Sequence, residues 1–191
     1  MKLNQFAKEW ILPFVIAVIL ALLIRKFLIL PIEVPTLSMY PTIKKGDKII
    51  STRIYNKDSI KRGDILVFIS EELNNERLIK RVIGLPGDEV VITDKGEMFI
   101  NGKKYDEPYV VFNENRPGNF KVPKDSYLFM GDNRADSFDA RRWKSPYIPY
   151  KCIEGKAQFI IFPFNRFGKF VYGQKALKWK SILLTKLVLL K

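Results

Sequence analysis

The stretch "EVVITDKGEMFINGKKYD", residues 89–106, decides the fold class. Short runs of β-forming residues in it are separated first by Asp-Lys-Gly and then by Asn101-Gly102. Asn-Gly is the preferred pair for the two-residue turn of a β-hairpin, because both residues of that turn adopt positive φ. The stretch therefore predicts a meander of three antiparallel strands.

The rest of the central region repeats this pattern of short β-rich runs bounded by turn-forming residues. The further runs lie at 47–55, 64–70, 77–85, 126–133 and 156–165. No stretch between Pro31 and Phe164 has the pattern of a long amphipathic helix. We therefore predict an all-β domain of antiparallel sheets over residues 31–165. Within it, residues 89–130 form a small inserted subdomain, and 112–125 is the most flexible connection.

A long apolar segment, "WILPFVIAVILALLIRKFLIL", occupies residues 10–30 and contains only Arg25 and Lys26 as charges. As a helix it would span about 31 Å, which matches a hydrocarbon core of roughly 30 Å. A cleaved signal peptide would need a small-x-small site after the apolar run, and the sequence has none there. A buried core helix is the other alternative. We predict a single transmembrane anchor.

The orientation of this anchor follows from the charges that flank it. Lys2, Lys8 and the free amine lie in residues 1–9, which favours a cytoplasmic N-terminus and a β domain outside the cell. Arg25 and Lys26, at the other end of the anchor, oppose this orientation.

The chain has 191 residues and a formal net charge of +13, which indicates an anionic partner. Its basic residues are dispersed, without an RNA-binding motif or a recognition helix, so anionic lipid is a better partner than nucleic acid. The tail at 166–191 is basic and amphipathic. Two arrangements fit this tail: along the membrane surface, or packed on the protein's own core.

The chain contains no histidine and a single cysteine, Cys152. These counts exclude an internal disulfide, a Cys/His zinc site and histidine-based catalysis. Acid–base chemistry near neutral pH therefore requires a Lys, Asp, Glu, Tyr or Cys with a displaced pKa. We predict no metal and no cofactor.

Four motifs in a fixed order resemble those of the bacterial type I signal peptidases, the S26 serine peptidases. They are "PTLSMYPTI", "GDILVF", "KRVIGLPGD" and "GDNRADSFDAR", at residues 35–43, 63–68, 80–88 and 131–141. The resemblance covers about residues 10–165, and the short segment 89–130 is similar to that of the compact Gram-positive-type enzymes. It implies a membrane-bound serine endopeptidase that removes N-terminal signal peptides from secretory preproteins at the outer face of the bacterial cell membrane.

The resemblance also implies roles for individual residues. Ser38 matches the nucleophile and Lys80 the general base. Thr36 matches the hydroxyl residue that forms the oxyanion hole with the Ser38 amide. Ser137 matches the serine that orients the lysine amine.

Four further residues match positions that hold the site by hydrogen bonds and an ion pair: Asp132, Asn133, Asp139 and Arg141. From spacing, we expect Asp139 and Arg141 to share one face of an extended segment. The sequence departs from the family at Leu37, where many relatives have glycine or serine before the nucleophile. A bulky side chain at this position is expected to press on the oxyanion loop or the substrate cleft.

Ionisation chemistry supports the choice of Lys80 over its neighbour Arg81 as the base. In a strand the two side chains point to opposite faces, and the apolar residues around them do not say which face is inward. Arginine stays protonated in proteins, whereas burial can lower the pKa of a lysine by several units. Only Lys80 can therefore accept the Ser38 proton.

Two other functions fit parts of this sequence. The first is a non-catalytic assembly factor for surface structures such as pili, but such relatives can lose the serine or the lysine, and both are present here. The second is a basic membrane protein that binds an anionic polymer and carries the serine incidentally. The sequence gives no oligomeric state.

Overall fold

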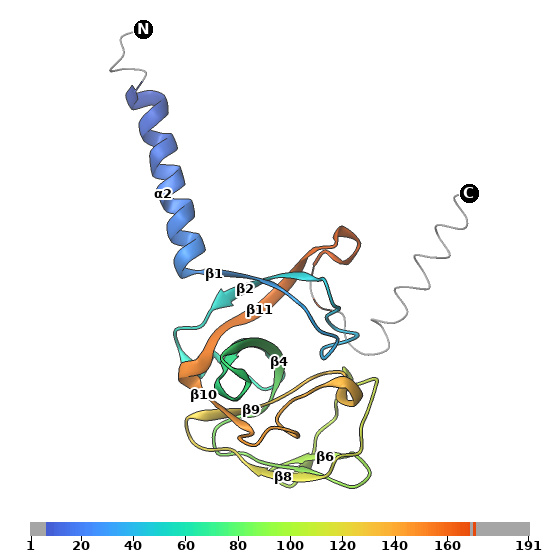
Figure 1. Cartoon of the computed structure of the whole chain (residues 1–191). Coiled ribbons are helices and arrows are strands. Elements are labelled where there is room, and N and C mark those ends of the chain that lie inside the picture. The colour runs from blue at the N-terminus through green and yellow to red at the C-terminus, as the bar shows by residue number, and fades with distance from the viewer. Residues whose placement is uncertain (1–6, 169, 171–191) are drawn as a thin grey trace, which may run out of the picture.

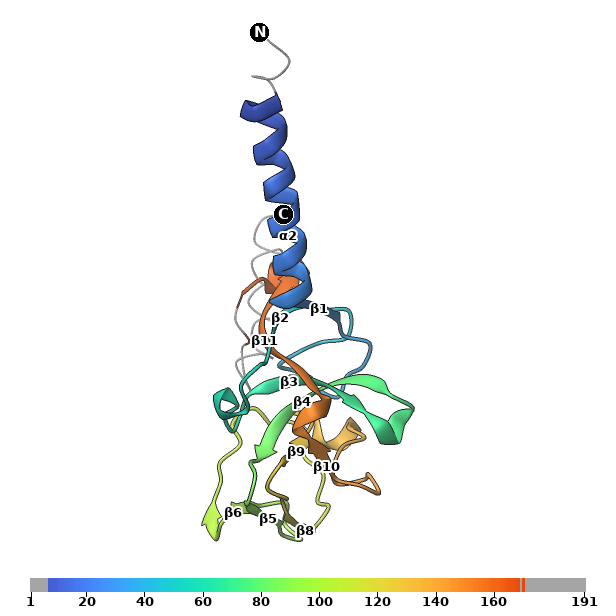
Figure 2. The ribbon, with the colours of Figure 1, turned by 90° about the vertical axis from the view of Figure 1, so that its left-hand side faces the viewer.

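The computed structural model describes residues 7–168 and 170. An apolar helix projects from one end of a β domain that contains two antiparallel sheets (Figures 1 and 2). The larger sheet has the strand order β1 (Ile29–Glu33), β2 (Lys48–Arg53), β11 (Ile153–Phe162), β3 (Ile65–Ser70), β4 (Glu76–Gly84), β9 (Ser126–Met130) and β10 (Tyr147–Pro149). The predicted all-β fold is confirmed.

The smaller sheet has the order β7 (Lys103–Lys104), β6 (Met98–Ile100), β5 (Glu89–Ile92) and β8 (Gly118–Lys121). Asn101 and Gly102 both have positive φ, 52° and 76°, and connect Ile100 directly to Lys103 in the β6–β7 ladder. The predicted Asn-Gly hairpin is therefore confirmed. The small sheet covers 89–121, and β9, which falls inside the predicted 89–130 subdomain, pairs with β4 in the larger sheet.

The expectation that residues 112–125 form only a flexible connection is wrong. β8 lies inside this stretch and pairs with β5, placing Phe120 opposite Val90. Phe120 packs on the core that fills the space between the two sheets. The partly buried ring of Phe120 and the pairing with β5 hold this short strand in place.

The N-terminal segment forms a short π-helix (η1, Ala7–Ile11) followed by α2 (Leu12–Phe27). Within them, the 19 residues Glu9–Phe27 form the one helix of the described chain that is long and apolar enough to cross a membrane. At 1.5 Å per residue it is about 28 Å long. Residues 28–30, counted in the predicted anchor, leave the helix because β1 begins at Ile29 and Leu30 is buried in the core.

The end of α2 is attached directly to the β domain. Arg53 Nε donates to the carbonyl oxygen of Lys26 at 3.0 Å, and the Tyr55 hydroxyl donates to that of Phe27 at 2.5 Å. Arg53 is the last residue of β2, the strand that pairs with β1, and Tyr55 follows two residues later. Helix and sheet are thus joined without an intervening linker.

Two clusters of buried side chains hold the β domain together. The first fills the space between the two sheets and includes Phe68, Val82 and Phe129. The second lies under β1, β2, β11 and residues 34–47, and includes Met39, Ile43 and Ile79.

Five short 3-10 helices connect the strands of the described chain: η2 (Lys57–Ser59), η3 (Glu71–Leu73), η4 (Arg134–Asp136), η5 (Tyr150–Cys152) and η6 (Phe164–Arg166). The predicted amphipathic tail, 166–191, lies outside the described residues except for 166–168 and 170.

Candidate active site

Residues 34–47, here called the nucleophile loop, carry Ser38 between β1 and β2. The loop is closed at its base, where Val34 N donates to Asp47 O at 3.0 Å and Gly46 N donates to Val34 O at 2.8 Å. Met39 and Ile43 are fully buried in the core below. This packing fixes the backbone on both sides of Ser38, whose side chain is nearly buried.

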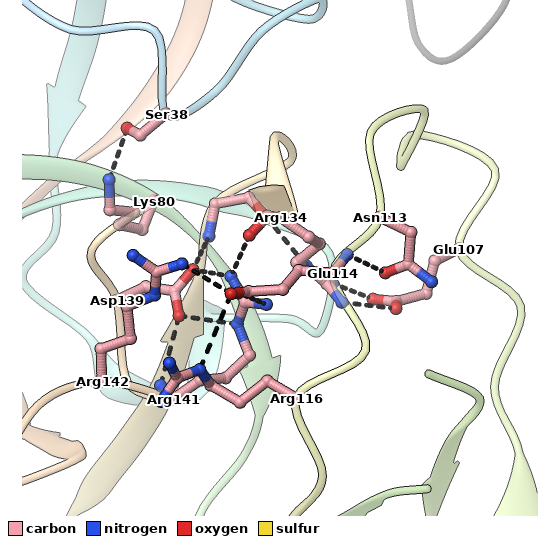
Figure 3. A network of polar contacts seen from close by, with 11 residues as sticks. Ser38, Lys80, Glu107, Asn113, Glu114, Arg116, Arg134, Asp139, Arg141 and Arg142 are labelled. Carbon is pink, nitrogen blue, oxygen red and sulfur yellow. Dashed lines mark hydrogen bonds and ion pairs between the residues drawn. The ribbon is translucent and has the colours of Figure 1, made fainter. Parts of the chain in front are cut away.

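Lys80 reaches Ser38 from β4, and its amine is hydrogen-bonded to the Ser38 hydroxyl (Figure 3). The side chain of Lys80 is only 4% exposed. Burial lowers the pKa of Lys80 from 10.5 to about 8, although the carboxylates of Asp139 and Asp132 act to raise it. Roughly a tenth of the amine is then neutral at pH 7.

This pair of groups can generate a nucleophile without histidine. When the Lys80 amine is neutral, the Ser38 hydroxyl can donate its proton to it as the oxygen attacks a carbonyl carbon. The resulting ammonium can return the proton to a leaving amine.

The Thr36 hydroxyl lies 3.2 Å from the Ser38 hydroxyl oxygen. No acceptor in the described part of the chain takes a hydrogen bond from the Ser38 backbone N–H. Two donors are thus placed beside the nucleophile, which is the arrangement that an oxyanion hole requires. The oxyanion roles of Thr36 and Ser38 stay a prediction.

A groove of about 290 Å³ runs from Lys80 and Thr36 between β1 and β4. β1 is an edge strand, and β9 pairs with β4 only from Arg81 onward, so residues 76–80 pair on one side, with β3. Both walls of the groove therefore present strand edges. Leu37 does not line this groove, and its side chain is 45% exposed.

Asn133 holds the nucleophile loop through two hydrogen bonds to its backbone. Asn133 N donates to the carbonyl oxygen of Ser38 at 3.0 Å, and Asn133 Nδ2 donates to that of Leu37 at 3.2 Å. These contacts fix the peptide plane on which the Ser38 N–H lies.

Asp132 joins β4, the strand that carries Lys80, to the nucleophile loop. Its carboxylate accepts from Arg81 Nε at 2.8 Å and Nη2 at 2.6 Å, and from the Thr42 hydroxyl at 2.5 Å. Arg81 also donates to Gly63 O and lies 4.0 Å from the Tyr109 ring centroid. Lys80 and Arg81 are thus both buried, on opposite faces of β4. No sequence motif indicates these roles of Arg81 and Thr42.

Asp139 and Arg141 form a bidentate ion pair, with Arg141 Nε and Nη2 donating at 2.9 and 3.1 Å. Burial acts to raise the pKa of Asp139, but the hydrogen bonds and charge of Arg141 and the Gly131 amide hold it below its ordinary value. The expected extended segment is wrong, because Asp139 starts a turn in which Arg142 N donates to its carbonyl oxygen at 2.8 Å. The pair closes within that turn.

Ser137 is fully buried near Ser38 and Lys80, the two residues here called the dyad. Within the described residues, no hydrogen bond joins it to Lys80. Its hydroxyl lies close enough to the Asp139 carboxylate to help lower the pKa of Asp139, although without good hydrogen-bond geometry. The orienting role of Ser137 stays a prediction. Gly131 lies between these groups, and a Cβ there would overlap both the Ser137 hydroxyl and the Ser38 carbonyl oxygen.

A network of arginines and carboxylates supports the turn behind the dyad (Figure 3). Arg134 is buried, pairs with Glu107, and donates from Nε to Gly131 O at 2.9 Å. Arg141 and Arg142 both donate to Glu114, at 3.2 and 2.7 Å. No motif predicted these partners.

Arg166 makes a further contact with the nucleophile loop that the sequence did not indicate. It donates from Nε and Nη2 to Asp47, at 2.9 to 3.2 Å, and from Nη2 to Thr42 O at 3.1 Å. Among residues 7–168 and 170, no group of three or more His, Cys, Asp or Glu side chains is placed to hold a metal ion.

Comparison with known proteins shows the family of this chain. The sequence model of the family described as "Signal peptidase, peptidase S26" matches residues 7–162. A signal peptidase I of Bacillus licheniformis is 41% identical over 84% of this chain and 91% of its own length. The signal peptidase I T of Bacillus subtilis (strain 168) is 41% identical over 86% of this chain and 89% of its own length.

Among solved structures, a signal peptidase I from Enterococcus faecalis V583 is 33% identical and has a TM-score of 0.43, with coverage of 51% of this chain and 96% of that chain. The extent of the family match and of the two Bacillus alignments is decisive. This chain belongs to the signal peptidase family, peptidase S26.

Proposed function

We propose that this protein is a membrane-anchored serine endopeptidase that removes N-terminal signal peptides from secretory preproteins, with Ser38 as nucleophile and Lys80 as general base. The observation that carries the proposal is the hydrogen bond between a buried lysine amine and a serine hydroxyl in a chain without histidine. Membership of the family supports the class of reaction and of substrate.

In the acylation step, Ser38 Oγ attacks the scissile carbonyl carbon while its proton passes to the neutral Lys80 amine. The Ser38 N–H and the Thr36 hydroxyl stabilise the negative charge on the carbonyl oxygen. Collapse of the tetrahedral intermediate breaks the C–N bond, and the Lys80 ammonium protonates the leaving amine. The mature protein leaves, and the signal peptide remains as an ester on Ser38.

In the deacylation step, water attacks this ester with Lys80 again as base. Its proton passes through Lys80 to Ser38 Oγ as the C–O bond breaks, which releases the signal peptide with a free carboxylate. Because the same amine serves both steps, its pKa of about 8 sets the fraction of competent enzyme in each.

The groove between β1 and β4 suits an extended peptide. Strand edges on both walls can take up backbone hydrogen bonds from a substrate that adds as a strand. Alternate side chains of an extended peptide point to the same side, so the residues at −1 and −3 would face the same wall of the groove. The apolar lining from Ile32, Leu78 and Ile79 favours apolar side chains there.

The anchor supports a site at the outer membrane surface. β1 lines the groove and begins two residues after α2 ends, so the groove opens near the membrane boundary. A substrate held by its own apolar signal segment shares that surface, which raises the effective concentration of its cleavage site. The cytoplasmic N-terminus and the anionic lipid partner belong to this proposal.

No observation favours the non-catalytic assembly factor. Both reactive side chains are present and bonded to each other, and the relatives compared above are signal peptidases. Binding of an anionic polymer rests on net charge alone.

Cleavage of a preprotein by the purified full-length chain in detergent tests the proposal. With a preprotein that carries a small-x-small site, mass spectrometry should find one cut directly after that site. Ser38→Ala and Lys80→Ala should each lower the rate by roughly 10³-fold or more, because the two groups act as a unit. The matched controls Ser145→Ala and Lys103→Ala, both exposed, should cleave normally. Cleavage that survives both dyad substitutions would overturn the mechanism.

A further inference from the structure

Leu37, the residue before Ser38, exposes an apolar side chain beside the nucleophile. It is 45% exposed and does not line the groove between β1 and β4. Two hydrogen bonds to its carbonyl oxygen fix its backbone, one from Asn133 Nδ2 at 3.2 Å and one from Tyr40 N at 3.0 Å. The second bond closes a turn over residues 37–40, with Ser38 at its second position. Leu37 is thus held in solvent next to the hydroxyl that would react.

Two aromatic side chains accompany Leu37. The turn places Tyr40 near Leu37, because the Cα atoms at the two ends of such a turn lie within about 7 Å. The ring centroids of Tyr40 and Phe112 are 5.7 Å apart, and Phe112 is 40% exposed. Leu37, Tyr40 and Phe112 are here called the apolar shelf. Exposed apolar side chains that occur singly need no explanation, whereas a group of them marks an interaction site.

The shelf is held by the same segment that holds the nucleophile loop. Asn133 binds the carbonyl oxygen of Leu37, and two residues later Ala135 N donates to Phe112 O at 3.2 Å. Lys44 Nζ lies 5.7 Å from the Tyr40 ring centroid, a cation–π contact that helps to hold this ring. The shelf is therefore preformed rather than assembled by a ligand.

The path of a substrate through the site leads to the shelf. In the proposed function the signal segment lies in the membrane, and the groove along β1 leads from the anchor end of the domain to Lys80 and Thr36. The groove therefore holds the residues before the scissile bond. The groove lining ends at Thr36, and Leu37 is the next residue of the nucleophile loop. An extended chain advances about 3.3 Å per residue, so the first residues after the scissile bond reach the shelf.

We propose that the apolar shelf binds the first two residues of the mature chain, and that Leu37 is a specificity-determining residue that favours apolar side chains at +1 and +2 of the preprotein. Contact with the shelf removes apolar surface of both partners from water. A charged side chain there would lose hydration without this gain. Because the mature segment leaves when the acyl-enzyme forms, the preference acts on acylation and is measured in kcat/KM. This inference rests on the proposed function.

A set of peptides that differ only after the scissile bond tests the preference. The parent peptide carries a small-x-small site and serine at +1, +2 and +4, and each variant has leucine at one of these positions. With the full-length protein in detergent, leucine at +1 or +2 should raise kcat/KM about fivefold, and leucine at +4 should not. The gain is below the tenfold or more of an enclosed apolar pocket, because the shelf is open. Equal kcat/KM for serine and leucine at both +1 and +2 would overturn the inference.

Substitutions in the shelf should change the ratio of kcat/KM between the leucine and serine peptides. This ratio cancels any general damage to the neighbouring Ser38, since both peptides use the same nucleophile. Leu37→Ser should bring the ratio close to one, whereas Leu37→Met should keep most of it. Phe112→Ala should lower the ratio roughly twofold, and Phe159→Ala, which removes a comparably exposed ring from β11, should not. A full ratio in Leu37→Ser would refute the role of Leu37.

A binding measurement separates this inference from the proposed function. Fluorescence anisotropy with labelled peptides and the full-length Ser38→Ala variant needs no cleavage. The peptide with leucine at +1 or +2 should bind about fivefold more tightly than the serine peptide, and adding Leu37→Ser should remove the difference. If cleavage depends on Ser38 but neither ratio exceeds one, the shelf is wrong and the peptidase stands. If cleavage does not depend on Ser38, the proposed function fails, while the anisotropy result still decides whether the shelf binds these residues.

Discussion

Two adjacent cations in β4 are buried by different means. Arg81 keeps its charge because Asp132 neutralises it through two hydrogen bonds. Lys80 has no such bidentate partner, and burial therefore favours its neutral form. One dipeptide thus supplies a fixed ion pair and, in the proposed mechanism, a base. Exchanging the two residue types would place a permanent charge against Ser38.

The rate of cleavage should follow the ionisation of Lys80. Only the neutral amine accepts the serine proton, so kcat/KM should rise with pH and reach half of its plateau near pH 8, the pKa of the buried amine. A pH series with a short preprotein-derived peptide in detergent measures this profile. A profile that is flat from pH 6 to 10 would contradict the assignment of Lys80 as the base.

The same burial should make stability depend on pH. The pKa of Lys80 is about 8 in the folded protein and 10.5 when unfolded, so between these values the unfolded chain holds more protons. The free energy of unfolding should therefore rise from pH 8 to 10.5. Below pH 8 it is lowered by the full cost of burying the protonated Lys80 amine. Lys80→Met should raise the free energy of unfolding at pH 7 by about 3 kcal/mol. Denaturant unfolding of both forms at pH 7 and 10 tests this, since only the unsubstituted protein should show the rise.

At the scale of elements, the site depends on loops held by distant partners. The nucleophile loop is held by Asn133, Asp132 and Arg166, which come from two other loops. Gly131 allows the turn before β10 to lie against the Ser38 carbonyl. The geometry of the dyad is therefore set by contacts between loops, while the sheet supplies Lys80.

Gly131→Ala should reduce kcat at least about tenfold, because the added methyl group must displace the Ser38 backbone or Ser137. Gly155→Ala is a matched control, since its Cβ would lie 2.8 Å from the Thr52 carbonyl oxygen, between strands and away from Ser38. Both variants should lose stability in thermal unfolding. Only Gly131→Ala should lose more activity than its folded fraction explains, and equal kcat values in the two variants would refute the role of Gly131.

Elements with a strong local pattern could be predicted from sequence. The runs that became β2, β3, β4 and β5 are rich in apolar residues, and Asn101-Gly102 specifies its own turn. β1, β8 and β10 were missed. β1 continues an apolar anchor, and the other two are short and depend on packing from the opposite sheet rather than on local preference.

The residues of the candidate site likewise divide into those that sequence motifs predict and those that depend on contacts between distant parts of the chain. The family motifs pointed to Ser38, Lys80 and the residues around them, and ionisation chemistry supported Lys80 over Arg81. Thr42, Glu107 and Arg166 were not found, because their partners lie 90, 27 and 119 residues away in sequence. Their contacts arise only when the sheet brings the loops together. The turn at Asp139 was mistaken for an extended segment because spacing alone does not reveal a buried hydrogen-bond acceptor.

At the scale of the whole molecule, the single cysteine can report the proposed orientation of the chain in the membrane. Cys152 lies in η5 on the β domain and is partly exposed. Burial raises the pKa of its thiol, so labelling needs mildly alkaline buffer. A membrane-impermeant maleimide should label it in intact protoplasts, and Cys152→Ser should remain unlabelled. Labelling that requires lysis would place the β domain in the cytoplasm and contradict the orientation.

The attachment of the helix end to β2 through Arg53 and Tyr55 has a consequence for where substrates are cut. A catalytic domain on a loose tether could sample many depths and tilts relative to the lipid. With this attachment, a helix that spans the bilayer would hold Ser38 at a set height above the bilayer plane. Among acceptable cleavage sites, the enzyme should therefore cut the one that emerges from the membrane at that height.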